Sequence, residues 1–180
     1  MTLNGKWTLI GPDENGNNIE VEATVPGCVH TDFMANGILG DIYYRDNSKT
    51  CQFIENNNYT YEKTFSVDKL CDNAYIEFDG LDTYCDVYLN GTKIGESDNM
   101  FLPYEFKVDG ILKEGENKLS VAFRSPTKEV DDRKGELWGC FSEERMFTRR
   151  VQCTYGWDWT ERFVTMWIYK YVRLTFRKPN

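Results

Sequence analysis

Apolar and polar residues alternate along most of this chain, the pattern of strands that bury one face. The alternation is clearest in short segments bounded by turn residues, at 6–10, 19–25, 59–67, 74–78, 84–89 and 117–123. Asn90-Gly91 predicts a hairpin into a further short strand, because both residues tolerate the positive φ of a type I′ turn. Residues 164–176 are predicted to form one long final strand.

Helical periodicity is weak and limited to a turn or two around 32–36 and within 136–146. The charged run 128–134 predicts a solvated loop and the most flexible segment. Many short strands with regular turn signals predict an all-β sandwich or barrel, and no repeat or linker divides it, so residues 1–180 form one domain. Side chains at alternate positions of a strand face the same side, and the apolar set is expected to face the core. This predicts that the core includes Trp7, Phe65, Phe78, Val87, Leu119, Val121 and Phe123.

Charge and cysteine usage exclude several classes of protein. A net charge of −8 without a basic stripe argues against nucleic-acid binding, and no apolar run approaches the roughly 20 residues that span a bilayer. The N-terminus lacks the apolar stretch of a secretory signal. A chain this long does not need disulfides, so we expect reduced cysteines and a cytoplasmic location. The six cysteines are scattered and form no C-x-x-C pair: Cys28, Cys51, Cys71, Cys85, Cys140 and Cys153.

A catalytic set is missing from the sequence. His30 is the single histidine and no G-x-S-x-G motif occurs, which argues against a hydrolytic triad and against a compact transition-metal site. The acids Glu143 and Glu144 are typical of a solvated face, and no glycine-rich phosphate motif is present. The chain therefore resembles a binding or scaffolding module without a cofactor.

The tetrapeptide Gly156-Trp157-Asp158-Trp159 is the most informative chemistry in the chain, and it lies in strand-like sequence. Indole faces stack on the C–H faces of a sugar, and an ionised carboxylate accepts hydrogen bonds from two neighbouring hydroxyls. The alternative is a strand whose two indoles lie in the core while Asp158 points to water. The spacing alone leaves both interpretations open.

Several segments, in order along nearly the whole chain, resemble the β-mannosidases. VPGCVHTD (25–32) resembles their VPG-x-VH-x-D, and GILGDIYYRDN (37–47) their G-x-I-x-DPYYRDNE, with Ile42 in place of proline. FDGLDT (78–83), LNG (89–91), NMFLPY (99–104) and RRVQCTYGWDW (149–159) resemble further family motifs. The hairpin pieces are shared with β-galactosidases and β-glucuronidases, whereas the VPG-x-VH and GWDW pieces are much more specific to β-mannosidases.

This resemblance implies a galactose-binding-like jelly-roll β-sandwich, the first domain of a multidomain glycoside hydrolase. The immunoglobulin-like domain and the TIM barrel with two catalytic glutamates would lie downstream, so the resemblance implies no catalytic residue on this chain and no activity of the chain alone. The complete enzyme would be a retaining β-mannosidase that hydrolyses terminal non-reducing β-D-mannose, with two barrel carboxyls about 5–5.5 Å apart. Its partners would be the β-mannoside and the enzyme's own catalytic domains.

By its place in the GWDW motif, Asp158 is expected to accept hydrogen bonds from mannose hydroxyls. Trp157 and Trp159 are expected to flank and position its carboxylate, and Arg149 to support the same loop. The family's GWDWGP is GWDWTE here, so the path of the chain after Trp159 stays open. His30 is expected to fix a loop by a hydrogen bond rather than to reach the sugar.

Two other functions remain open: an autonomous carbohydrate-binding module, or a purely structural domain of a β-galactosidase/β-glucuronidase-type hydrolase. An autonomous module should show several aromatic residues around one pocket. A domain that lends a loop to its neighbour should instead show one exposed loop beside an apolar patch.

Overall fold

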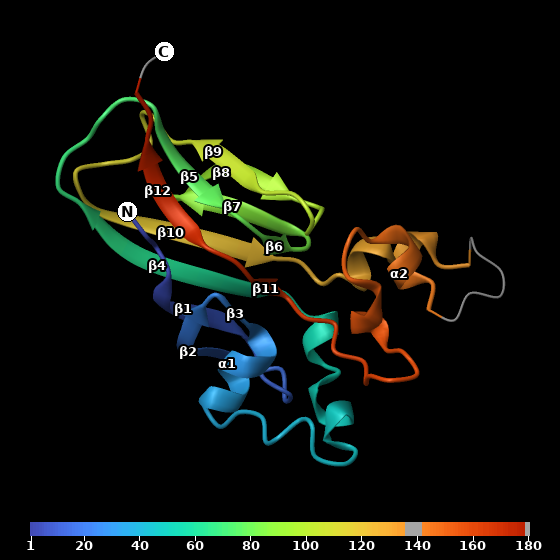
Figure 1. Ribbon diagram of the computed structural model, residues 1–180. Coiled ribbons are helices and arrows are strands. Elements are labelled where there is room, and N and C mark those ends of the chain that lie inside the picture. The colour runs from blue at the N-terminus through green and yellow to red at the C-terminus, as the bar shows by residue number, and fades with distance from the viewer. Residues whose placement is uncertain (136–141, 179–180) are drawn as a thin grey trace.

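The computed structural model describes residues 1–135 and 142–178, and strands make up most of its regular structure. A six-stranded antiparallel sheet and a three-stranded one form the two layers of a β-sandwich (Figure 1). A small third sheet continues beside them. The predicted all-β sandwich is therefore confirmed.

The larger sheet is built from the segments with the clearest alternation. Its strands, in spatial order, are β2 (Asn18–Val25), β1 (Gly5–Pro12), β4 (Tyr59–Val67), β10 (Gly115–Phe123), β7 (Cys85–Leu89) and β8 (Thr92–Ser97). Asn90 and Gly91 both have positive φ and join β7 to β8, as the hairpin signal predicts.

The second layer is the sheet β12 (Val172–Phe176), β5 (Ala74–Phe78) and β9 (Tyr104–Lys107). The third sheet consists of β3 (Gly27–Cys28), β11 (Trp167–Ile168) and β6 (Leu81–Asp82). The prediction of one strand over 164–176 is wrong, because the chain bends at Lys170 and passes from the third sheet into the second. Alternation shows which side chains are buried, but it does not show which neighbour the backbone pairs with.

The core lies between the layers and joins residues of both sheets into one apolar cluster. All seven side chains that parity places inside are buried: Trp7, Phe65, Phe78, Val87, Leu119, Val121 and Phe123. Burying one face of each strand is what stabilises a sandwich of this size.

Helical segments connect the strands and gather outside the sheets. They are α1 (Val29–Ala35), η1 (Asn47–Cys51), η2 (Ile54–Asn56), η3 (Lys128–Arg133), α2 (Glu144–Phe147) and η4 (Gln152–Tyr155). The prediction of a solvated loop over 128–134 is confirmed in its exposure but wrong in its conformation, because the segment forms η3 and buries Val130 alone. The predicted helical turn within 136–146 lies partly outside the described residues.

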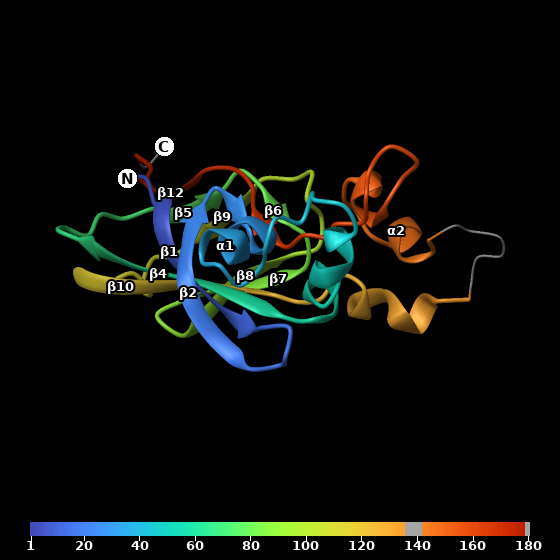
Figure 2. The same cartoon turned by 90° about the horizontal axis from the view of Figure 1, so that it is seen from below.

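The two termini lie toward one end of the molecule, and α2 and η4 lie at the opposite end (Figures 1 and 2). The Trp157–Trp159 motif directly follows η4, so it belongs to that opposite end. None of the described helices is long and apolar enough to span a membrane.

Candidate functional site

The Trp157–Trp159 motif forms a tight chain reversal. The Trp157 N–H donates to the Thr160 carbonyl at 3.0 Å, and the Thr160 N–H donates back at 3.4 Å. Asp158 and Trp159 therefore occupy the tip, where Trp159 is 70% exposed and Trp157 is 48% exposed. The alternative that both indoles lie in the core of a strand is wrong. Asp158 is also exposed, so one turn presents a carboxylate and two indoles to solvent.

The segment that carries this turn, residues 151–164 (the motif loop), is held at both ends by one buried carboxylate. Before the loop, Arg150 Nη2 pairs with Asp82 Oδ2 at 2.8 Å, and neither side chain is exposed. After the loop, Thr165 Oγ1 accepts from the same Arg150 nitrogen at 3.0 Å, and Trp167 Nε1 donates to Asp82 Oδ2 at 2.6 Å. Burial raises the pKa of Asp82, although the Arg150 charge opposes this effect.

Nearer the turn, polar contacts to η1 and η2 determine the path of the chain after Trp159. Arg162 Nε lies 3.0 Å from both carboxylate oxygens of Glu55, and its Nη2 lies 2.8 Å from Oε1. Ser48 Oγ donates to the Glu161 carboxylate at 3.3 Å. The part of the loop that lacks the family's glycine and proline is thus attached to a segment more than a hundred residues away.

A shallow groove of about 460 Å³ runs along the indole of Trp157. Its polar and aromatic lining includes Ser142, Glu144, Tyr155, Trp157, Glu161 and Arg162. The Arg145 guanidinium lies over the Trp157 ring, 4.8 Å from its centre, which limits the directions in which that indole can turn. The groove therefore offers carboxylates, cations and one indole face at a single surface.

The two neighbouring arginines of the motif go to different places. Arg149 is exposed, and its carbonyl accepts from the Met100 N–H at 3.0 Å, whereas Arg150 is buried beneath the loop. The supporting role expected for Arg149 stays a prediction. Reasoning from sequence missed Glu55 and Arg162, since no spacing links residues so far apart in the chain.

Exposed apolar side chains lie on the motif loop and on segments that contact it. Val151 N–H contacts Met100 Sδ at 3.0 Å, which brings the residues after Met100 beside the loop, and the Tyr43 ring lies 5.6 Å from that of Phe163. We call this set the apolar patch; its exposed members are Tyr43, Phe101, Leu102, Met146, Val151, Trp157 and Trp159. Several exposed apolar side chains on adjoining segments favour a surface that meets another surface.

His30 lies beneath the loop rather than at its surface. Its ring packs edge-on against Phe163 with centres 5.9 Å apart, and its Nδ1 has no hydrogen-bond partner in the described part of the chain. Burial, aided by the positive charge of Arg150, lowers the pKa of His30 to about 4. The structure therefore shows ring packing for His30, and among the described residues the Nδ1 atom does not make the loop-fixing hydrogen bond expected of this residue.

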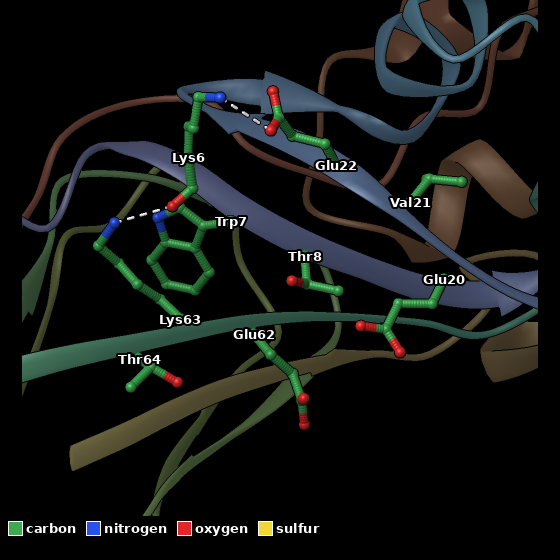
Figure 3. Close-up of a pocket in the computed structure, with 9 residues that line it drawn as sticks. All are labelled: Lys6, Trp7, Thr8, Glu20, Val21, Glu22, Glu62, Lys63 and Thr64. Carbon is green, nitrogen blue, oxygen red and sulfur yellow. Dashed lines mark hydrogen bonds and ion pairs between the residues drawn. The ribbon is translucent and has the colours of Figure 1, made fainter. Parts of the chain in front are cut away.

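A second hollow, of about 420 Å³, lies over the strands β1, β2 and β4. Figure 3 shows the charged and polar side chains around it, which include Lys6, Thr8, Glu20, Glu22, Glu62 and Lys63. Trp7 is the only aromatic residue in its lining, and it is 4% exposed. This hollow lacks the several aromatic residues expected of an autonomous sugar-binding pocket.

Across residues 1–135 and 142–178, no three metal-ligating side chains are grouped to hold an ion.

Comparisons with known proteins give matches over nearly the whole chain. The family model described as "Glycosyl hydrolase 2 galactose-binding domain-like" matches residues 7–170. A β-mannosidase of Capra hircus is 33% identical over 97% of this chain and 21% of its own length. β-Mannosidase B of Thermothelomyces thermophilus is 32% identical over 92% of this chain and 20% of its length.

A solved structure extends these matches to the fold. The β-D-mannosidase of Dictyoglomus thermophilum is 39% identical, with a TM-score of 0.91 over 98% of this chain and 22% of that protein. The chain thus spans about a fifth of the length of the relatives it matches.

Proposed function

The chain belongs to the glycosyl hydrolase 2 galactose-binding-like family, and from this premise we propose that it is the accessory domain of a retaining β-mannosidase. In this role it contributes the Trp157–Trp159 turn to the subsite that binds a terminal β-D-mannose residue. The catalytic carboxylates belong to the enzyme's other domains, so the chain alone is inactive. A cytoplasmic location is part of the same proposal.

The observation that carries this proposal is the exposure of Trp157, Asp158 and Trp159 on one turn. A carboxylate accepts strong, charge-assisted hydrogen bonds from vicinal hydroxyls, and indole rings favour the C–H faces of the sugar. A chain that only fills space would bury these rings, because exposing two indoles forgoes the free energy of their burial.

The same geometry explains why the turn needs a partner. Ligand pockets enclose 70–90% or more of a small ligand, whereas a two-residue tip can cover only one side of a sugar. The apolar patch around the motif loop supports docking of a further domain there, which would supply the rest of the enclosure. The charged hollow on the larger sheet offers no exposed aromatic residue in its lining and so does not favour an autonomous module.

Replacing Asp158 with asparagine in the full-length enzyme tests this function. The amide accepts only through its oxygen and carries no charge, so we expect kcat/KM for an aryl β-mannoside to fall about 10- to 150-fold. The melting temperature should stay unchanged, because Asp158 is exposed at the tip of a turn. Asp68→Asn is the matched control, because Asp68 is an exposed aspartate that directly follows the C-terminal end of β4.

A change of less than twofold in Asp158→Asn would refute the sugar contact. Early melting with normal kinetics would make Asp158 a structural residue. The isolated chain should not hydrolyse the aryl β-mannoside, and micromolar binding of mannose by calorimetry would instead support the autonomous module.

A further inference from the structure

We propose that the Glu55–Arg162 ion pair positions the Trp157–Thr160 turn, and thereby Asp158, for the sugar. This inference rests on the proposed function, because positioning matters only if Asp158 contacts the substrate. It assigns a role to an ion pair close to Thr160 and Glu161, the positions where the family has glycine and proline.

The acid of the pair is itself rigidly held. Glu55 lies in η2, and its carbonyl accepts hydrogen bonds from Ser125 Oγ at 2.5 Å and from Thr127 Oγ1 at 2.8 Å. Those hydroxyls directly follow β10, a central strand of the larger sheet. The Glu55 backbone is therefore attached to the scaffold, and its side chain is only 10% exposed.

From Glu55 the constraint passes to Arg162 through three close nitrogen–oxygen contacts. A planar guanidinium that meets a carboxylate in this way is fixed in direction as well as in position. Burial alone would lower the pKa of Arg162, but the hydrogen bond and charge of Glu55 raise it, so the arginine stays charged. The Arg162 carbonyl also accepts from Gln52 Nε2 at 2.9 Å, which fixes its backbone.

From Arg162 the constraint reaches the turn. Its Nη1 lies 3.5 Å from the Tyr155 carbonyl, and its guanidinium lies 5.3 Å from the centre of the Tyr155 ring. A Cβ placed on Gly156 would meet the Cβ of Arg162 at 3.5 Å, so the two backbones run side by side at that point. The adjacent Phe163 N–H donates to the Thr154 carbonyl at 2.9 Å. Both arms of the reversal are thus held just below Trp157.

Apart from this pair, the segment is held by single hydrogen bonds: Ser48 to Glu161, Gln52 to the Arg162 carbonyl, and the Phe163 N–H to the Thr154 carbonyl. The closure of the turn itself consists of two backbone hydrogen bonds, one of them 3.4 Å long, with Asp158 and Trp159 between them. The Asp82–Arg150 pair holds only the base of the loop, at its two ends. A displacement of about 1 Å at a binding group can cost roughly a hundredfold in rate, so the range of positions open to Asp158 affects catalysis.

Three variants of the full-length enzyme test the proposal: Arg162→Met, Glu55→Gln and Arg162→Lys. We expect the first two to lower kcat/KM for an aryl β-mannoside by at least about tenfold. Arg162→Lys keeps the charge but loses the planar fork, so it should recover only part of the loss. Arg173→Met is the matched control, because Arg173 also pairs with a nearly buried glutamate, Glu77 at 2.7 Å, but on β12.

A double-mutant cycle separates positioning from general structural support. If Arg162 acts through Asp158, adding Arg162→Met to Asp158→Asn should lower kcat/KM by no more than about twofold further. Fully additive losses would overturn the positioning role while leaving the proposed function intact. If Asp158→Asn has no effect by itself, the proposed function fails, and the positioning role fails with it.

Amide hydrogen exchange in the 180-residue chain gives a readout that does not depend on activity. Residues 154–160 should exchange at least about tenfold faster in Arg162→Met than in wild type, and Arg173→Met should leave them unchanged. Unchanged exchange in both Arg162→Met and Glu55→Gln would show that the pair does not hold the turn, and would overturn the proposal.

Discussion

Replacing Arg150 with methionine should be among the most destabilising single changes in this chain. The substitution removes the guanidinium that pairs with Asp82 at 2.8 Å and donates to Thr165 at 3.0 Å. It also removes a cation that lies 5.5 Å from the centre of the Tyr155 ring. Methionine is long and flexible enough to fill most of the space, so the loss is mainly electrostatic.

The expected loss is about 3–5 kcal/mol at pH 7, the range for breaking a buried ion pair from one side. The Asp82 carboxylate stays fully buried and keeps hydroxyl and indole donors, but it has lost its counter-charge. Total stabilities of about 5–15 kcal/mol make this a large fraction, and the melting temperature should fall by roughly 10 °C.

The pH dependence of the variant gives a second check. Burial already raises the pKa of Asp82, and loss of Arg150 raises it further. A folded carboxyl whose pKa lies above its unfolded value binds protons more tightly when folded, so its contribution to stability decreases as pH rises. The deficit of Arg150→Met relative to wild type should therefore be smaller at pH 5 than at pH 8.

Urea unfolding followed by fluorescence measures these differences, with Arg124→Met as the matched control. Arg124 pairs with Asp86 at 2.7 Å, but both side chains are partly exposed, so its loss should cost less than about 1 kcal/mol. A deficit of that size in Arg150→Met, or a deficit that grows toward acid pH, would refute the role assigned to the buried pair.

Two further predictions concern protonation and thiols. The folded His30 has a pKa of about 4 and the unfolded ring about 6.5, so the unfolded chain binds the extra proton. Stability therefore decreases as the pH is lowered, by about 1 kcal/mol from pH 7.5 to 5.5. Unfolding curves of His30→Gln should lack this part of the decrease, and an equal decrease in both proteins would contradict it. Thiol titration of unfolded, unreduced protein should count six cysteines: the five described ones are free, and Cys140 lies outside the described residues. A count of zero would mean an oxidised, exported domain.

The sequence alone determined the strands and the core, because alternation is a local property that the burial of one strand face imposes. The β7–β8 hairpin and all seven expected core residues follow from it. The resemblance in the short motifs likewise identified the family, since those segments match in order along nearly the whole chain.

Alternation predicted one strand over 164–176, whereas the chain there passes from one sheet into another. The buried side chains of Ile168 and Val172 keep their parity, yet their strands lie in different sheets. At 128–134, charge suggested a loop, but a turn of helix buries Val130 there. Hydrogen-bond partners and tertiary burial decided both cases, and neither is encoded in the local spacing.

For the candidate site too, the sequence indicated the residue types and the tertiary structure decided their arrangement. The residue types at Trp157, Asp158 and Trp159 indicated sugar chemistry, but strand-like spacing could not show that the segment reverses and exposes both indoles. The anchors of that reversal, Asp82 with Arg150 and Glu55 with Arg162, are 68 and 107 residues apart in the chain. An ion pair at such a separation exists only because the folded backbone brings the two ends together, so the tertiary structure alone decided how the site is held.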